Sequence, residues 1–159
     1  MPAYDPRSVK GIGVTYATTT MGADHTAGYS VTSNILNVGG HIDPLAKEGQ
    51  IELSRNLQIA TAAIDSAGLC IFTAFAIIDY EPVSHALIDM INAQYGTNWS
   101  VDDWFNLGRH VLKTEREFNK AAGFTNKDDR LPEFFSEPVP PHNATWDFTG
   151  KELDQVFNF

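Results

Sequence analysis

The chain has 159 residues, 43% of them hydrophobic, so it can bury a core of single-domain size without disulfides as staples. Its net charge of −9, with 20 acidic residues against 11 basic ones, argues against binding nucleic acid, because phosphate contacts need concentrated Lys and Arg. A single cysteine excludes an intrachain disulfide, and the longest apolar run, residues 69–78, is too short to span a bilayer. We therefore expect a cytoplasmic chain that binds neither nucleic acid nor membranes.

The first segment, residues 1–42, is rich in Gly, Thr and Ser and shows no sustained hydrophobic period. We expect short helical turns and loops here, packed against another part of the protein. Gly11-Ile12-Gly13 is only a fragment of a dinucleotide-binding fingerprint, because no strand is predicted before it. His25 lies among small residues that let a ligand approach the backbone closely. It either forms a structural hydrogen bond or exchanges a proton near neutral pH in acid-base chemistry.

A helical core is predicted over residues 43–124. Asp43-Pro44 has the pattern of an N-cap followed by proline in the first turn, and apolar residues recur at helical spacing from there to Gly68. A second, apolar helix is predicted over residues 72–78. The inward face of the long first helix consists of Leu53, Leu57, Ala60 and Ile64.

Two more helices are predicted in this core. Ser84 is the expected cap of a helix that ends at Gly96, and Ser100 with Asp103 forms a capping signature for a helix that ends near Gly123. The predicted inward faces are Leu87, Ile91 and Tyr95 on the former helix, and Trp104, Leu107, Val111 and Phe118 on the latter.

The last segment, residues 125–159, is polar and rich in proline, which predicts an extended arm on the surface. Thr149 and Glu152 have the spacing of a capping box for a short final helix. Because the chain has no internal repeat and no alternating strand pattern, the predicted fold class is all-α. It would combine a loop-rich pocket segment, a helical core and this arm.

The end of the long predicted helix carries a carboxylate, Asp65, shortly before the single thiol, Cys70. Cys70 is either a small core side chain or a thiolate ligand to iron or zinc. Since such centres normally need about four ligands, any cluster would take its other ligands from elsewhere. Asp65 faces the negative end of the helix dipole, so it is either solvated, bonded to a nearby backbone N–H, or an acceptor for a ligand rich in N–H donors.

Several specific segments follow one another along the chain, among them an Asp-x-x-Gly-Leu-Cys element: residues 2–7, 13–18, 22–25, 64–70, 118–119 and 128–132. Together they resemble the C-terminal helical region of the tungsten-containing aldehyde:ferredoxin oxidoreductases. The resemblance covers most of the chain. It implies a tungsten ion, or molybdenum in some relatives, held by the dithiolenes of two pterins beside a 4Fe-4S cluster.

The resemblance also implies roles for individual residues. Cys70 would supply the fourth thiolate of the cluster, a soft anionic ligand that iron-sulfur centres use. Asp65 would accept hydrogen bonds from one pterin, and the backbone of Gly68 and Leu69 would approach the same pterin. Each of these roles suits the residue type.

On the substrate side, the resemblance implies that His25 lies close to the metal, orients a substrate oxygen and moves a proton. Tyr4 would reach the same pocket. Some members carry a lysine where this chain has Ala27, so the pterin contact of that lysine has no equivalent here. The implied reaction converts an aldehyde and water to a carboxylic acid and passes two electrons, one at a time, to ferredoxin.

The family's N-terminal β-rich domain, its other three cluster cysteines and its pocket glutamate have no counterpart in the sequence. We therefore expect the chain to form half of a cofactor pocket, to bind no cofactor in isolation and to be inactive alone. Its expected partners are the missing N-terminal domain, ferredoxin and a small aldehyde. The alternatives are a non-catalytic helical module that docks on another subunit through its glycine-rich N-terminal segment, and a metal-free degenerate paralogue.

Overall fold

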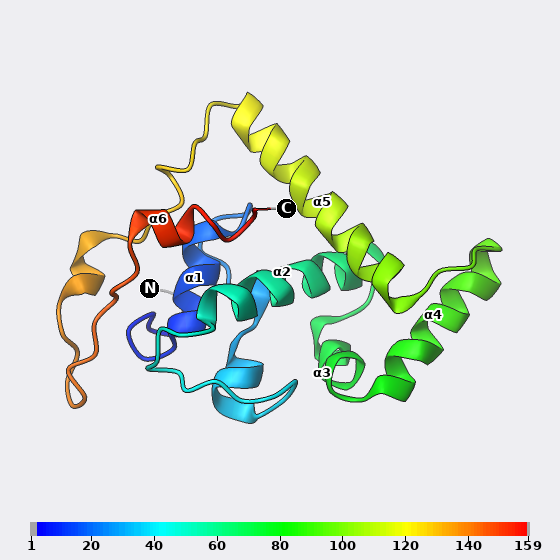
Figure 1. Ribbon diagram of the computed structural model, residues 1–159, viewed down its shortest axis with the longest axis horizontal. Coiled ribbons are helices and arrows are strands. Elements are labelled where there is room, and N and C mark those ends of the chain that lie inside the picture. The colour runs from blue at the N-terminus through cyan, green and yellow to red at the C-terminus, as the bar shows by residue number, and fades with distance from the viewer. Residues whose placement is uncertain (1–2, 159) are drawn as a thin grey trace.

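The computed structural model describes residues 3–158, and within them the regular secondary structure is helical (Figure 1). The predicted all-α class is confirmed: residues 3–158 form no β-strand, and the β-type pairing among them is an isolated bridge between Val139 and Ala144. The elements are α1 (Lys10–Thr18), η1 (Thr26–Gly28), η2 (Thr32–Leu36), α2 (Gln50–Ser66), α3 (Ile71–Asp79), α4 (Glu81–Tyr95), α5 (Val101–Ala121), η3 (Glu133–Ser136) and α6 (Gly150–Leu153).

The centre of the fold is the packing of α2 against α1, η1 and α5 (Figure 1). Between α1 and α2 the contact is polar: the Thr15 hydroxyl lies 2.7 Å from the Ser54 hydroxyl and donates to the Gly28 carbonyl oxygen at 2.9 Å. A Cβ on Gly28 would stand 2.7 Å from Cγ of Gln58, so glycine is what lets η1 approach α2 this closely. These contacts fix the loop that carries His25 on the scaffold.

The other half of the molecule packs α3, α4 and α5 on the C-terminal part of α2. Helix α5 begins with the predicted capping box, in which the Asp103 N–H donates to the Ser100 hydroxyl and the Ser100 N–H donates to the Asp103 carboxylate. It crosses α2 at Gly108, where a Cβ would overlap the carbonyl oxygen of Ile59. The buried cluster at this junction consists of Ala63, Ile64, Ala74, Leu87, Ile88 and Trp104.

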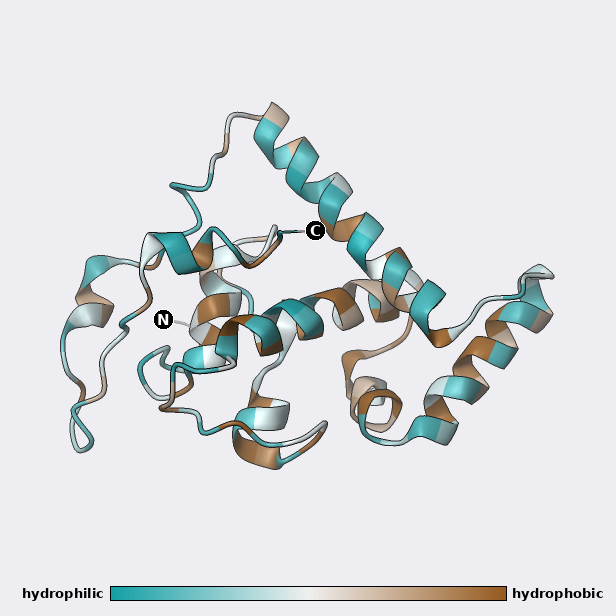
Figure 2. Ribbon diagram, viewed as in Figure 1, coloured by the Kyte–Doolittle hydropathy of each residue, from teal (hydrophilic) through white to brown (hydrophobic). Residues whose placement is uncertain are grey.

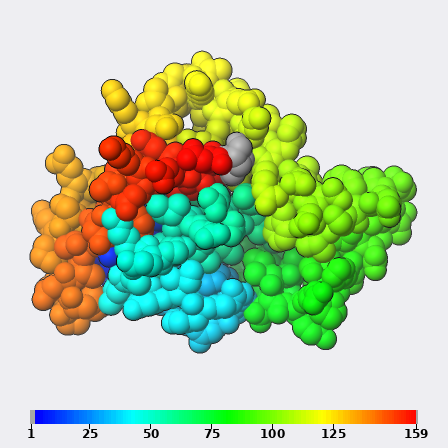
Figure 3. Space-filling view, viewed as in Figure 1, coloured from blue at the N-terminus to red at the C-terminus, as the bar shows by residue number. Residues whose placement is uncertain are grey.

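The C-terminal arm folds back over the beginning of the chain. Leu153 and Val156 are buried against α1, and a Cβ on Gly13 would overlap the Trp146 ring. Figure 3 shows the C-terminal segment, in red, lying against the residues of α2. Most residues of the arm are exposed, as expected for an arm on the surface, and a few of its apolar side chains also cover α1.

Two predicted helix starts are wrong. The Asp43 carboxylate accepts the N–H of Leu45 in a turn, and Gly49 has φ +78°, so α2 begins only after it. Ser84 lies inside the first turn of α4, where its hydroxyl donates to the carbonyl oxygen of Glu81. The helix begins at Glu81 instead, with Pro82 in its first turn, where proline is favoured.

The predicted inward faces are correct near the helix junctions and wrong at the helix ends. Tyr95 is 75% exposed and Phe118 is 74% exposed, because the ends of α4 and α5 extend beyond the helices that they pack on. In α5 the predicted Trp104 is buried, together with Gly108 and Leu112, which were not predicted. Helix α1 was not predicted, because all of its residues are buried and an all-round buried helix has no amphipathic period.

Figure 2 shows apolar residues along α3 and α4, and some of their large side chains, such as Phe72 and Met90, are exposed. In α3 only Ala74 is buried, and Phe72 is 77% exposed. Within residues 3–158 no single helix is long and apolar enough to cross a membrane; α3 and α4 pass that test only together, with a bend of 116° between them. The division of the chain near residues 42 and 124 stays a prediction.

Candidate functional site

The loop between α1 and η1 holds His25 half-buried at the surface of the molecule. Its shape is set by Asp24, whose carboxylate accepts the Thr26 N–H at 3.0 Å and the Thr26 hydroxyl at 2.6 Å. The loop then enters η1, whose last residue, Gly28, packs closely against Gln58 of α2. The imidazole is thus carried by a backbone with defined hydrogen bonds.

The structure brings Tyr4 and His25 together, although they lie far apart in the sequence. Their ring centroids are 5.4 Å apart in an edge-on arrangement. The Tyr4 N–H also donates to the hydroxyl of Tyr16 at 3.4 Å, and this hydrogen bond attaches the N-terminal segment to α1. Their proximity supports a shared pocket, and their chemical roles stay predictions.

Sequence reasoning missed Tyr29, the third ring of this cluster. Its hydroxyl oxygen lies 2.5 Å from that of Tyr4, and its ring centroid is 5.8 Å from that of His25. Burial, followed by the hydrogen bond with Tyr4, raises the pKa of Tyr29 to about 12. The one signal in the sequence was its position in the loop segment shortly after His25.

The aromatic cluster continues onto α3 and leads towards Cys70. Tyr29 meets Phe75 edge-on with centroids 6.2 Å apart, and Phe75 stacks on Phe72 at 6.3 Å. Cys70 is the N-cap residue of α3, and its side chain is exposed. The interpretation of Cys70 as a small core side chain is therefore wrong, and the thiol is open to a ligand.

Asp65 lies in the last turn of α2 and is exposed, with no hydrogen-bond donor to its carboxylate among residues 3–158. Partial burial of the carboxyl group, then repulsion from Asp24 and Glu115, raises its pKa. Asp24, the residue before His25, is thus one of the two charges that raise the pKa of Asp65. Such a carboxylate gains from N–H donors brought by a ligand.

The turn between Asp65 and Cys70 presents open backbone. Gly68 has φ +70°, and no atom lies within 4 Å of the position of a Cβ on it. Leu69 is half-buried against the cluster that joins α2, α3 and α5, and its N–H donates to the Ile64 carbonyl oxygen. A ligand can therefore reach the Gly68 backbone, while Leu69 anchors the turn.

The described residues fit one edge of a metal-pterin and iron-sulfur site, and only one edge. No group of three or more His, Cys, Asp and Glu side chains converges within residues 3–158. Cys70 offers one exposed thiol, the donor type of iron-sulfur clusters, and Asp65 offers a carboxylate without a donor. The remaining ligands of any such group would have to come from outside this chain.

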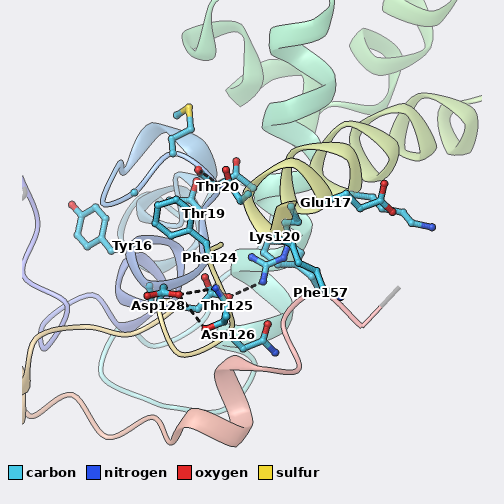
Figure 4. A pocket seen from close by; sticks show the side chains of 17 residues that line it. Tyr16, Thr19, Thr20, Glu117, Lys120, Phe124, Thr125, Asn126, Asp128 and Phe157 are labelled. Carbon is cyan, nitrogen blue, oxygen red and sulfur yellow. Dashed lines mark hydrogen bonds and ion pairs between the residues drawn. The ribbon is translucent and has the colours of Figure 1, made fainter. Parts of the chain in front are cut away.

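A separate cavity of about 600 Å³ lies between the end of α1, the C-terminal half of α5 and the turn after it (Figure 4). Arg116 and Asp129 form an ion pair of 2.7 Å in its wall, and Tyr16 contributes from α1. None of the site residues predicted from the sequence lines this cavity. Its cationic and acidic side chains balance one another, so its charge favours no ligand class.

The family described as "Aldehyde ferredoxin oxidoreductase, domains 2 & 3" matches residues 1–157. A tungsten-containing aldehyde ferredoxin oxidoreductase of Pyrococcus horikoshii is 39% identical over 145 residues, and that of Pyrococcus furiosus is 37% identical over 145 residues. Each match covers 88% of this chain but 23% of the relative, so the chain spans about a quarter of the length of these proteins.

Proposed function

Because the chain belongs to the aldehyde ferredoxin oxidoreductase family, we propose that it forms one side of the active-site pocket of an enzyme that oxidises an aldehyde to a carboxylic acid. The observation that carries this proposal is the exposed thiol of Cys70 at the start of α3, the helix whose Phe75 ring contacts Tyr29 beside the Tyr4–His25 pair. The proposal assigns the thiol of Cys70, the carboxylate of Asp65 and the imidazole of His25 to one pocket. The rest of the pocket would come from the part of the enzyme outside this chain.

In the complete enzyme a tungsten-pterin group and a 4Fe-4S cluster would take up the two electrons released when an aldehyde and water become a carboxylic acid and two protons. Cys70 would hold one iron of the cluster through its thiolate. His25 would hold or accept a proton at an imidazole nitrogen, and Tyr4 would orient the substrate oxygen through its hydroxyl. Ferredoxin is the proposed electron acceptor.

Asp65 would receive N–H donors of a pterin ring. The pKa of Asp65 is raised because partial burial, and then repulsion from Asp24 and Glu115, destabilise the charged carboxylate in the isolated chain. N–H donors from a ligand would stabilise the charged form of Asp65 through charge-assisted hydrogen bonds. The Gly68 backbone, open on its Cβ side, lets that ligand come close.

The experiment is anaerobic co-expression of this chain with the complementary N-terminal portion of the Pyrococcus furiosus relative in the presence of tungstate. We expect the mixture to contain tungsten and iron and to reduce a viologen dye only when an aldehyde is present. The chain purified alone should contain neither metal in stoichiometric amount. A Cys70→Ser variant serves as the control, since it keeps the size of the side chain and removes the thiolate.

Two results would contradict the proposal. Stoichiometric tungsten and iron in the isolated chain would contradict the half-pocket argument. A mixture that holds both metals but shows no aldehyde-dependent dye reduction would contradict the proposed reaction.

A second candidate function is a non-catalytic module that docks on another subunit. The exposed apolar side chains of Phe72 on α3, Met90 on α4 and Tyr80 between the two helices favour a surface that is covered in an assembly. Both functions require this surface. The same experiment separates them, because a docking module would form a stable complex that contains no tungsten.

A further inference from the structure

We propose that Tyr29 is a positioning residue of this site, which fixes the Tyr4 hydroxyl and the His25 imidazole relative to each other and to α3. Its catalytic meaning rests on the proposed function. The contacts that carry it belong to this chain alone and can be tested without the complete enzyme. No role for this residue was expected from the sequence.

Tyr29 is in contact with every part of the cluster. Its hydroxyl pairs with that of Tyr4, and its ring faces the rings of Tyr4, His25 and Phe75 at centroid distances of 5.8, 5.8 and 6.2 Å. Tyr4 and His25 contact each other, but neither has a ring contact with α3 among the described residues. Tyr29 therefore connects the catalytic pair to the helix that begins after Cys70.

The backbone of Tyr29 is held firmly enough for this task. Its carbonyl oxygen accepts the Thr32 N–H at 3.1 Å and the Thr32 hydroxyl at 2.8 Å, both from η2. On the other side it follows Gly28, which packs tightly on Gln58 of α2. Movement of the ring is thus restricted from both directions along the chain.

The two hydroxyls share one hydrogen bond, in which either oxygen could be the donor. In both directions the bond fixes the position of the Tyr4 oxygen, which the proposed function places next to a substrate oxygen. Removing only the Tyr29 hydroxyl would leave the Tyr4 hydroxyl able to rotate, although the packing of the rings would remain.

The test on this chain uses Tyr29→Phe, which removes the hydroxyl and keeps the ring, and Tyr95→Phe as a control at an exposed tyrosine. With tyrosine and histidine labelled by carbon-13, we expect Tyr29→Phe to shift the Cζ signal of Tyr4 at neutral pH and to leave the His25 ring signals in place. Tyr29→Leu, which also removes the ring, should shift the His25 signals. An unchanged Tyr4 signal in Tyr29→Phe would overturn the proposal.

A second measurement follows the phenol groups by ultraviolet absorbance as pH rises, with circular dichroism recorded over the same range. The titration step of Tyr29 near pH 12 should be lost in Tyr29→Phe, while that of Tyr16, whose pKa burial also raises, should remain. In Tyr4→Phe the pKa of Tyr29 should fall yet stay above the ordinary tyrosine value of about 10, because burial remains. An unchanged Tyr29 titration in Tyr4→Phe would show that the two hydroxyls do not interact.

In the assembled enzyme, Tyr29→Phe should lower kcat by about tenfold with little change in KM, because the Tyr4 hydroxyl would remain but would no longer be held in position. Tyr95→Phe should change neither. Equal activity of Tyr29→Phe and wild type, where Tyr4→Phe and His25→Ala are impaired, would overturn the role of Tyr29 and keep the proposed function. If the wild-type assembly oxidises no aldehyde, the proposed function fails, and the Tyr4 signal still decides whether Tyr29 positions the pair.

Discussion

The Tyr29 ring lies edge-on to Phe75, with centroids 6.2 Å apart, and this contact joins the histidine loop to the helix that begins after Cys70. Tyr29 precedes α2 in the chain and Phe75 follows it, so the contact joins segments on the two sides of that helix. Through this contact the position of the imidazole depends on the position of α3.

Cys70 should react as an accessible thiol in the folded chain. Because its side chain is exposed at the start of α3, a maleimide reagent should label it fully without denaturant. In the assembled enzyme the same thiol should be protected by the cluster. Labelling that requires prior unfolding of the isolated chain would contradict the structure.

Asp65→Asn should slightly stabilise the isolated chain at neutral pH, by less than about 0.5 kcal/mol because the group is solvent-screened. The folded-state pKa of Asp65 is raised, so its charge destabilises the fold once the pH exceeds that pKa, and the cost vanishes at low pH where the group is protonated. Urea unfolding at pH 7 and pH 3 measures the difference. Asp89→Asn, at an exposed position of α4, is the matched control.

The same Asp65→Asn substitution should act in the opposite direction on the assembled enzyme. Loss of the charged acceptor should lower the tungsten content by about tenfold, the usual scale for removing a partner of a bound metal group. Elemental analysis of the purified mixture gives the answer. A tungsten content equal to that of the wild type would remove Asp65 from the proposed pterin contacts.

Gly108→Ala should destabilise the chain by about 1–3 kcal/mol. The added Cβ would overlap the carbonyl oxygen of Ile59, so α5 would have to move away from α2. Chemical denaturation followed by circular dichroism measures the loss. Thr114→Ala, at an exposed position of the same helix, should stay within about 0.5 kcal/mol of wild type.

Glu152 should make the fold sensitive to acid. The Thr149 N–H, together with Lys47, lowers the pKa of Glu152 to about 2, well below the value of about 4.3 in an unfolded chain. A depressed folded-state pKa gives stability that is present above the unfolded value and lost as pH falls towards 2. Glu152→Gln should therefore flatten the loss of stability between pH 5 and about 2. Glu48→Gln, at an exposed residue without such partners, should leave the curve unchanged.

The sequence by itself determined the features that depend on neighbours within a few residues. The capping box at Ser100 and the helix stop at Gly96 are local hydrogen-bond and backbone effects, so both could be predicted and both are confirmed. The all-α class follows from the same local patterns. The Asp-x-x-Gly-Leu-Cys element could be found for the same reason, since its residues are contiguous.

Only the tertiary structure decided what depends on contacts between distant segments. It buried α1 on every side, which erased the period by which a helix is detected in a sequence, and it left the Cys70 thiol at the surface instead of in the core. It also placed Tyr29 between Tyr4 and Phe75, residues with no sequence relationship to it. Burial and side-chain contacts arise from the packing of whole helices, and the free energy of that packing is not encoded in any short window of residues.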